Sequence, residues 1–251
     1  MKEQFHILNG DALKDQFPKE LSENIIVARE CLIEGDLRGS TLDIFFQTRS
    51  KFIADTFEEA SVEGYFENVV SEFEKIKHIP KVAEINLWFE DDLFCQANFW
   101  FTVHLLLEFE KDNSVFLVRP RNLTQYGFGA YSVEGLKQLF KERIRISDLK
   151  SIQRLWNNYQ NGATIELLNS AKILKEKYPF VIDAVKAHVD RIPTKDLDGK
   201  PKRVLREIIK EKGSTNFSLV FREFNKSEYI YGFGDVQVKR LFDEITSENN
   251  P

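Results

Sequence analysis

The chain has very little of what disulfide-rich domains and histidine-based zinc sites require. Of its 251 residues, 2 are cysteine and 4 are histidine. Cys31 and Cys95 cannot make a disulfide framework, and no cysteine or histidine pair has the spacing of metal ligands. No apolar run approaches the ~20 residues that cross a bilayer, and the residues after Met1 are polar, unlike a signal peptide. We therefore expect a cytoplasmic protein that does not enter a membrane.

Several catalytic motifs are also missing from the sequence. It contains no phosphate-binding P-loop, no nucleophile elbow and no histidine-pair zinc motif. Tyr126-Gly127-Phe128-Gly129 recurs as Tyr231-Gly232-Phe233-Gly234, but neither copy has the three glycines and preceding strand of a dinucleotide fingerprint. We interpret the recurrence as two similar glycine turns that lead into helices, in preference to an internal duplication.

What the sequence does contain is a large apolar fraction and an uneven charge. Hydrophobic residues make up 42%, and 22 residues are phenylalanine, which favours an ordered protein with an aromatic core. Residues 1–110 carry 10 Lys or Arg against 22 Asp or Glu, a net charge of −12, whereas residues 111–251 carry 25 against 18, a net charge of +7. Two explanations remain open: two units with different partners, or two halves that dock on each other.

The first half alternates between strand-like and helix-like patterns. Short apolar runs predict strands at 5–8, 25–27, 84–89 and 115–118, and the segments between them predict helices at 12–17, 41–54, 56–77 and 91–109. Such alternation is typical of right-handed crossovers in a parallel sheet that helices cover on both faces. The prediction is an α/β fold with a small, mostly parallel, four-stranded sheet in residues 1–125.

From residue 126 onward the pattern is helical. Helices are predicted at 133–143, 148–160, 164–177, 179–191, 201–212, 216–225 and 236–246, with a short strand at Tyr229–Tyr231. A helix, a tight turn, a second helix and a strand form the outline of a winged helix-turn-helix. We therefore predict an all-helical, winged-helix-like domain in residues 126–251.

The most informative segment is Leu87 to Gln96. Three carboxylates, Glu90, Asp91 and Asp92, separate an apolar strand from a nearly all-apolar helix. Charge between two core-forming elements is costly unless something at the junction uses or solvates it. This junction is therefore the first candidate for a functional site.

The other strands of the predicted sheet also end in polar residues, and ligands of open parallel sheets bind at the carboxyl ends of the strands. Carboxylates that face arginines there suit a magnesium ion with a small anionic ligand. The predicted catalytic residues are Asp11, Glu30, Glu90 and Asp92. The predicted ligand-binding residues are Asn9, Gly10, Arg29, Glu34, Cys95, Gln96 and Arg119.

Several acids near these strand ends, and Cys95, have a structural alternative. Asp11, Asp91 and Asp92 could cap helices, Glu30 and Glu34 could be solvated loop acids, and Cys95 could be a small buried core residue. The basic stretch 200–212 could contact nucleic acid, but Glu207 and Glu211 interrupt it and the same residues fit a solvated face. Nucleic acid is the less favoured partner, and the oligomeric state is left open.

Three functions compete on these grounds. The first is a ligand-binding α/β domain that acts as a magnesium-dependent enzyme on a nucleotide or another phosphoester, with Arg29 or Arg119 offsetting phosphate charge. The second is a regulator that senses a small molecule and binds DNA through its helical half. The third is an adaptor that binds another protein.

Four stretches resemble a bacterial family known as domain of unknown function 1835. They are His6–Asp11, Arg29–Gly35, Leu87–Gln96 and a helical tail that includes Leu155–Tyr159 and Tyr178–Phe180 with His188. The resemblance covers most of the chain and implies a fold and a site, but no established activity. The polar positions that recur in the family correspond here to Asp11, Arg29, Glu30, Glu34, Glu90, Asp92, Cys95 and Gln96.

Overall fold

The computed structural model describes residues 2–248, which contain one five-stranded sheet in the order β2-β1-β3-β4-β5. The strands are β1 (Gln4–Asn9), β2 (Ile25–Ala28), β3 (Glu84–Trp88), β4 (Ser114–Val118) and β5 (Ile144–Ile146). The first four are parallel, which confirms the α/β prediction, and β5 runs antiparallel to β4. The predicted number of four strands is wrong. The short edge strand β5 has only three residues, and one of them is Arg145, so it lacks a continuous apolar run.

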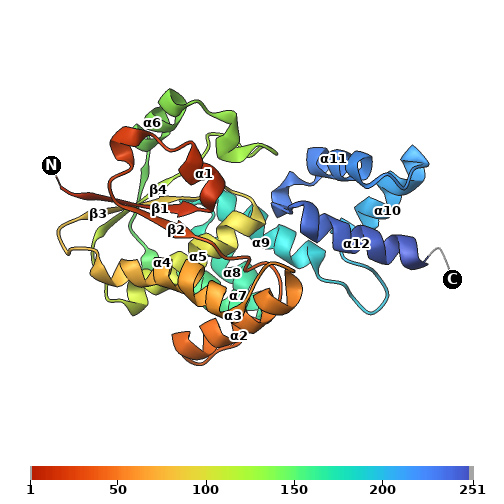
Figure 1. Cartoon of the computed structure of the whole chain (residues 1–251), viewed down its shortest axis with the longest axis horizontal. Helices are drawn as coiled ribbons and strands as arrows, with labels where there is room; N and C mark the ends of the chain where they lie inside the picture. The colour runs from red at the N-terminus through yellow and green to blue at the C-terminus, as the bar shows by residue number, and fades with distance from the viewer. Residues whose placement is uncertain (1, 249–251) are drawn as a thin grey trace.

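Helices cover both faces of the sheet (Figure 1). On one face, α1 (Asp11–Asp15) and α6 (Val133–Lys141) pack over Leu8, Trp88 and Val118. On the other, α5 (Leu93–Glu108) packs over their neighbours Ile7 and Leu87. Successive strand residues therefore point to opposite layers, as continuous apolar strands require.

The connection from β2 to β3 differs in detail from the prediction. It contains α2 (Leu42–Thr56), α3 (Val62–Tyr65), the π-helical turn η2 (Phe66–Val70), α4 (Ser71–Glu74) and the 3-10 turn η3 (Lys75–His78). The predicted helix 56–77 begins late because Phe57 is extended and Ser61 caps α3 by accepting the Gly64 N–H. A serine N-cap of this kind starts a new helix.

Helix α5 is buried on nearly all sides because a second layer of helices covers it. That layer is α7 (Leu149–Gln160), α8 (Thr164–Leu174) and α9 (Pro179–Arg191), and α5 packs against α7 and α9. The Phe101 and Trp156 rings lie 4.8 Å apart at this interface. Burial in protein explains the long apolar run of α5, and none of the helices described within 2–248 is long and apolar enough to cross a membrane.

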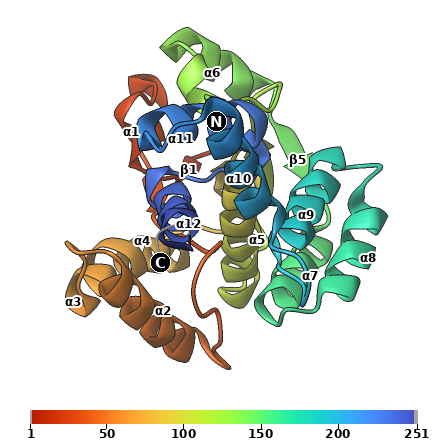
Figure 2. The same ribbon diagram turned by 90° about the vertical axis from the view of Figure 1, so that its right-hand side faces the viewer.

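The last three helices form a lobe beyond the carboxyl ends of the parallel strands (Figures 1 and 2). We call residues 200–248 the C-terminal lobe; it contains α10 (Lys200–Lys212), α11 (Phe217–Ser227), η5 (Tyr229–Tyr231) and α12 (Asp235–Glu248). The strand predicted at Tyr229–Tyr231 is wrong, because these residues form a 3-10 turn that the Gly232 N–H closes on the Tyr229 carbonyl. The described part of the lobe thus lacks the strand of a winged helix.

The two halves of the chain are closely packed together. One apolar cluster extends from Ile7 to Ile245, and β5 joins residues beyond 126 to the sheet, so that part of the chain is not all-helical. Ion pairs between Glu20 and Lys137, Glu84 and Arg143, and Glu34 and Arg240 connect the acidic half to the basic half. These pairs support docking of the two halves, while a domain boundary near residue 125 stays a prediction.

Candidate functional site

The order of the parallel strands determines where a crevice opens. The chain leaves β1 for β2 on one side, whereas β3 leads to β4 on the other side. Connections that diverge in this way leave a crevice between the carboxyl ends of β1 and β3, where open α/β sheets bind ligands. Asn9 ends β1, and Glu90 follows β3 by two residues.

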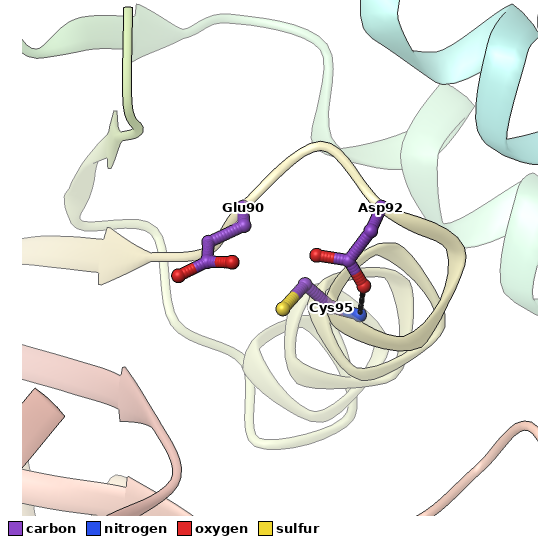
Figure 3. A group of neighbouring side chains, drawn as sticks. All are labelled: Glu90, Asp92 and Cys95. Atoms are coloured by element: carbon purple, nitrogen blue, oxygen red, sulfur yellow. Dashed lines mark hydrogen bonds between the residues drawn. The ribbon is translucent and has the colours of Figure 1, made fainter. Parts of the chain in front are cut away.

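Glu90, Asp92 and Cys95 converge at this point (Figure 3). One carboxylate oxygen of each acid and the Cys95 Sγ lie within 4.8 Å of one another. We call these three residues the acid–thiol cluster. Glu90 and Asp92 come from the β3–α5 turn, in which Asp92 is the N-cap of α5, and Cys95 lies in the first turn of that helix. The alternative interpretation of Asp92 as a cap is correct as well, and it is what orients this carboxylate.

Each acid of the cluster is held through one oxygen only. Asp92 Oδ1 accepts the Cys95 N–H at 2.9 Å, and Glu90 Oε1 accepts the Phe128 N–H at 2.7 Å. Within residues 2–248, the second oxygen of each carboxylate has no hydrogen-bond partner outside the cluster. In Figure 3 the two carboxylates and the sulfur point toward a common centre.

The electrostatics of the cluster oppose ionisation. Burial, helped by the charges of Asp92 and Asp91, raises the pKa of Glu90 to about 7. Burial likewise raises the pKa of Asp92, and burial together with the Asp92 and Glu90 charges raises the pKa of the Cys95 thiol. No lysine or arginine among the described residues pairs with Glu90 or Asp92. Protons or a bound cation are therefore needed to balance the charge.

Asn9 contacts the sulfur directly, and Asn98 holds Asn9 in place. Asn9 Nδ2 donates to Cys95 Sγ at 2.8 Å. The side chain of Asn98, on the next turn of α5, donates from Nδ2 to Asn9 Oδ1 and to the Glu30 carbonyl, both at 2.8 Å. Because Asn98 occupies the Asn9 oxygen, the Asn9 amino group must face the sulfur. Sequence reasoning identified Asn9 but missed Asn98, whose only signal was an amide inside an apolar helix.

The two Tyr-Gly-Phe-Gly turns each press one glycine against one acid. Gly127 and Gly232 both have a left-handed backbone, with φ of 47° and 63°. A Cβ on Gly127 would lie 2.0 Å from Glu90 Oε2, and one on Gly232 would lie 2.1 Å from Asp92 Oδ1. Both turns lead into helices, as predicted from the sequence. That they also enclose the cluster was not predicted.

A cavity of about 210 Å³ adjoins the cluster. The β3–α5 turn, the chain before α6 and the C-terminal lobe all contribute to its wall, which is formed by Glu90, Asp92, Cys95, Thr124, Gln125, Asn225, Tyr229, Gly232, Phe233 and Gly234. The lobe residues were not predicted as site residues, because nothing in the sequence shows which strand ends the lobe covers.

Other predicted site residues take structural roles. Glu30 is buried with Arg49, which donates to both of its oxygens, and the Tyr65 hydroxyl donates to Glu30 Oε1 at 2.5 Å. Asp11 and Arg29 form a two-pronged ion pair with contacts of 2.6 and 2.8 Å. Neither Glu30 nor this pair lines the 210 Å³ cavity.

The remaining predicted residues divide between support and a second cavity. Arg119 pairs with Asp91 and stacks on the Phe180 ring, and Gln96 Nε2 donates to the Glu90 carbonyl at 2.8 Å. Glu34 accepts from Gln237 and Arg240 and lines a larger cavity of about 540 Å³. Gly10 follows Asn9 and precedes α1. Of the eleven predicted residues, Asn9, Glu90, Asp92, Cys95 and Gln96 therefore lie in or directly against the cluster.

No protein-family model, curated protein or solved structure matches this chain.

Proposed function

We propose that the acid–thiol cluster binds a divalent transition-metal ion, and that the chain is a metal-dependent enzyme acting on a small molecule in the 210 Å³ cavity. One observation carries this proposal: two carboxylates and a thiol lie within 4.8 Å of one another, with Asp92 and Cys95 buried, Glu90 half-buried and no counter-charge among the described residues. A doubly charged cation would relieve the repulsion that now favours protonation.

The donor set favours a zinc-like ion over the magnesium expected from the acids alone. Magnesium prefers an octahedral shell of oxygen ligands and keeps several waters, whereas thiolate sulfur selects softer ions such as Zn²⁺. Cys95 supplies the only sulfur of the cluster. Asn9 would donate a hydrogen bond to that sulfur and Gln96 would hold the Glu90 backbone, the kind of outer support that orients metal ligands.

Three protein ligands would leave one coordination position open to the cavity. Catalytic zinc sites keep such a position, whereas structural sites fill all four with protein. When bound, the ion would act as a Lewis acid on a ligand in that position. The phosphoester substrate expected from the sequence has less support, because Arg29 and Arg119 are already paired with Asp11 and Asp91.

The regulator hypothesis also has less support than the metal site. On α10, the side chains of Lys200, Lys202, Arg206 and Lys212 each pair with an acid of the described chain. With four of its six basic side chains paired in this way, the helix offers few free contacts to phosphate. The resemblance to domain of unknown function 1835 stays a prediction and supplies no activity of its own.

Titration of the metal-free full chain with Zn²⁺, Co²⁺, Mn²⁺ and Mg²⁺ tests the proposal. We expect Zn²⁺ and Co²⁺ to bind more tightly than Mg²⁺, and the Co²⁺ form to show sulfur-to-metal charge-transfer absorption. Asp92→Asn should abolish tight binding while keeping the helix cap, because asparagine caps as well as aspartate. Glu90→Gln should weaken binding in the same way.

The two cysteines provide the matched control. Cys95→Ser should remove the charge-transfer band, whereas Cys31→Ser should leave it unchanged, because Cys31 lies outside the cluster. Binding that persists in both Asp92→Asn and Cys95→Ser would place the ion elsewhere and end the proposal. So would failure of the wild-type chain to bind any of the four ions.

A further inference from the structure

The wall of the 210 Å³ cavity has a distinctive charge composition. It contains two acids and a thiol but no lysine or arginine among the described residues. The cavity of about 540 Å³ has Arg191, Lys202 and Arg240 in its wall, and another of about 640 Å³ has Lys111, Arg145 and Lys150. The two larger cavities thus have basic side chains in their walls, whereas the cavity beside the cluster has no basic side chain in its wall.

We infer that the molecule bound in the 210 Å³ cavity is small and uncharged, and that it binds through hydrogen bonds; the inference rests on the proposed metal site. Two carboxylates and a thiolate carry three negative charges, so a divalent ion leaves a net charge of −1 at the cluster. An anion such as phosphate would meet repulsion from that charge.

Neutral hydrogen-bonding groups are available around the cavity. Gln125 comes from the chain before α6, and Asn225 and Tyr229 come from the C-terminal lobe. No side-chain hydrogen bond joins Gln125, Asn225 or Tyr229 to another residue of the described chain, in contrast to the cavity-lining Asp92 and Glu90. Their amide and hydroxyl groups are thus free to bind a ligand from two sides, with one side contributed by the lobe.

The size of the cavity suits a small ligand. About 210 Å³ corresponds to roughly seven water molecules at ~30 Å³ each. A ligand of about that many non-hydrogen atoms would fit within this volume. Phe233 lies in the walls of both this cavity and the 540 Å³ cavity. The inference assigns Asn225 and Tyr229 as specificity-determining residues.

The test uses the Co²⁺-loaded full chain and two probes above neutral pH, uncharged imidazole and anionic inorganic phosphate. The cobalt visible spectrum reports entry into the open coordination position, and the sulfur-to-metal band shows that the ion stays bound. We expect imidazole to shift the visible spectrum and phosphate to leave it unchanged at the same concentration.

Two variants on one helix sharpen the test. Asn225→Lys places a cation in the cavity wall and should raise the affinity for phosphate, measured from the cobalt spectrum, by about tenfold or more. Ser227→Lys adds the same charge two residues away, outside the cavity wall, and should not. The inference is overturned if phosphate binds the wild-type chain as tightly as imidazole does, or if both lysine variants respond alike.

The proposed function fails in a different and recognisable way. Absence of a sulfur-to-cobalt band in the wild-type chain would overturn the metal site, and the inference about its ligand with it. A normal cobalt band with a strong phosphate response would overturn the ligand class alone.

Discussion

Two sets of acids near the carboxyl edge of the sheet differ in their partners: Glu30 has a counter-charge, whereas Asp92 and Glu90 have none among the described residues. Glu30 and Asp92 are each only 4% exposed. Both Glu30 oxygens are engaged, by the Arg49 guanidinium, the Tyr65 hydroxyl and the Cys31 N–H. Asp92 and its neighbour Glu90 have one backbone N–H each and no cation among the described residues.

The difference separates structural acids from candidate functional ones. A buried carboxylate with a full set of partners holds the fold together and has nothing left for a ligand. A buried carboxylate that lacks a counter-charge raises the free energy of the folded state, and such an arrangement persists where binding uses it. Burial alone would make Glu30 and Asp92 equal candidates for a functional site. They differ because Asp92 lacks a cationic partner among the described residues.

The largest loss of stability is expected when the buried pair of Glu30 and Arg49 is broken. Arg49→Met removes the only cation that contacts Glu30 within the described chain and should lower the free energy of unfolding by about 3–5 kcal/mol, since it leaves a buried charge unpaired. Urea denaturation measures the change. The double variant Glu30→Gln with Arg49→Met should recover part of the loss, and a double variant no more stable than the single one would contradict the comparison.

Metal addition should stabilise the folded chain through the acid–thiol cluster alone. At a free ion concentration of about 100 times Kd, Zn²⁺ should raise the free energy of unfolding by about 3 kcal/mol through mass action. A chelator should reverse this gain, and Asp92→Asn should not show it. Thermal melting measures the stabilisation. If Zn²⁺ stabilised wild type and Asp92→Asn equally, the ion would bind elsewhere.

The part of the site that could be predicted is the part that depends on local geometry. Parallel strands end side by side, so Asn9 at the end of β1 and Glu90 after β3 were expected to lie close together, and both lie close to the sulfur of Cys95. A helix cap followed by one turn brings Asp92 and Cys95 together whatever the rest of the fold does. The four parallel strands could also be predicted locally, because a buried strand forms a short apolar run in the sequence.

The unpredicted part depends on long-range packing. Arg49 lies 19 residues beyond Glu30 on a helix whose packing the sequence does not specify, so Glu30 could not be recognised as a paired acid. The recurrence of Tyr-Gly-Phe-Gly was visible, but the approach of Gly232 to Asp92 joins positions 140 residues apart. Such contacts follow from the placement of the C-terminal lobe, which no local pattern encodes.

The pH dependence of stability should reveal the missing counter-charge of Glu90 in the absence of any metal. Because the pKa of Glu90 is raised from 4.5 to about 7 in the folded chain, the folded state holds a proton that the unfolded chain has lost between these values. Its contribution to stability is therefore present at low pH and lost as pH rises through this window. Relative to Glu90→Gln, the free energy of unfolding of the chelator-treated wild type should fall by about 3 kcal/mol across this window. Urea denaturation across the pH range measures this difference, and a constant difference would contradict it.

The smallest effect concerns the glycine that presses on Asp92. In Gly232→Ala, the new Cβ would lie 2.1 Å from Asp92 Oδ1 and 2.8 Å from Phe94 Cβ. Gly162→Ala is the matched control, because Gly162 has the same φ of 63° but no heavy atom within 4 Å of its Cβ. Both variants should lose about 1 kcal/mol for the left-handed backbone, and Gly232→Ala should lose about 1–2 kcal/mol more from the collision.

Only the variant at Gly232 should also change the metal site. Asp92 Oδ1 is fixed by the helix cap and Phe94 Cβ by the helix backbone, so the lobe must shift away from the cluster to make room for the new methyl group. Zinc affinity measured by titration should therefore fall in Gly232→Ala and stay unchanged in Gly162→Ala. Equal zinc affinities in the two variants would mean that the lobe does not help to shape the site, and that the acid–thiol cluster is held by the β3–α5 turn alone.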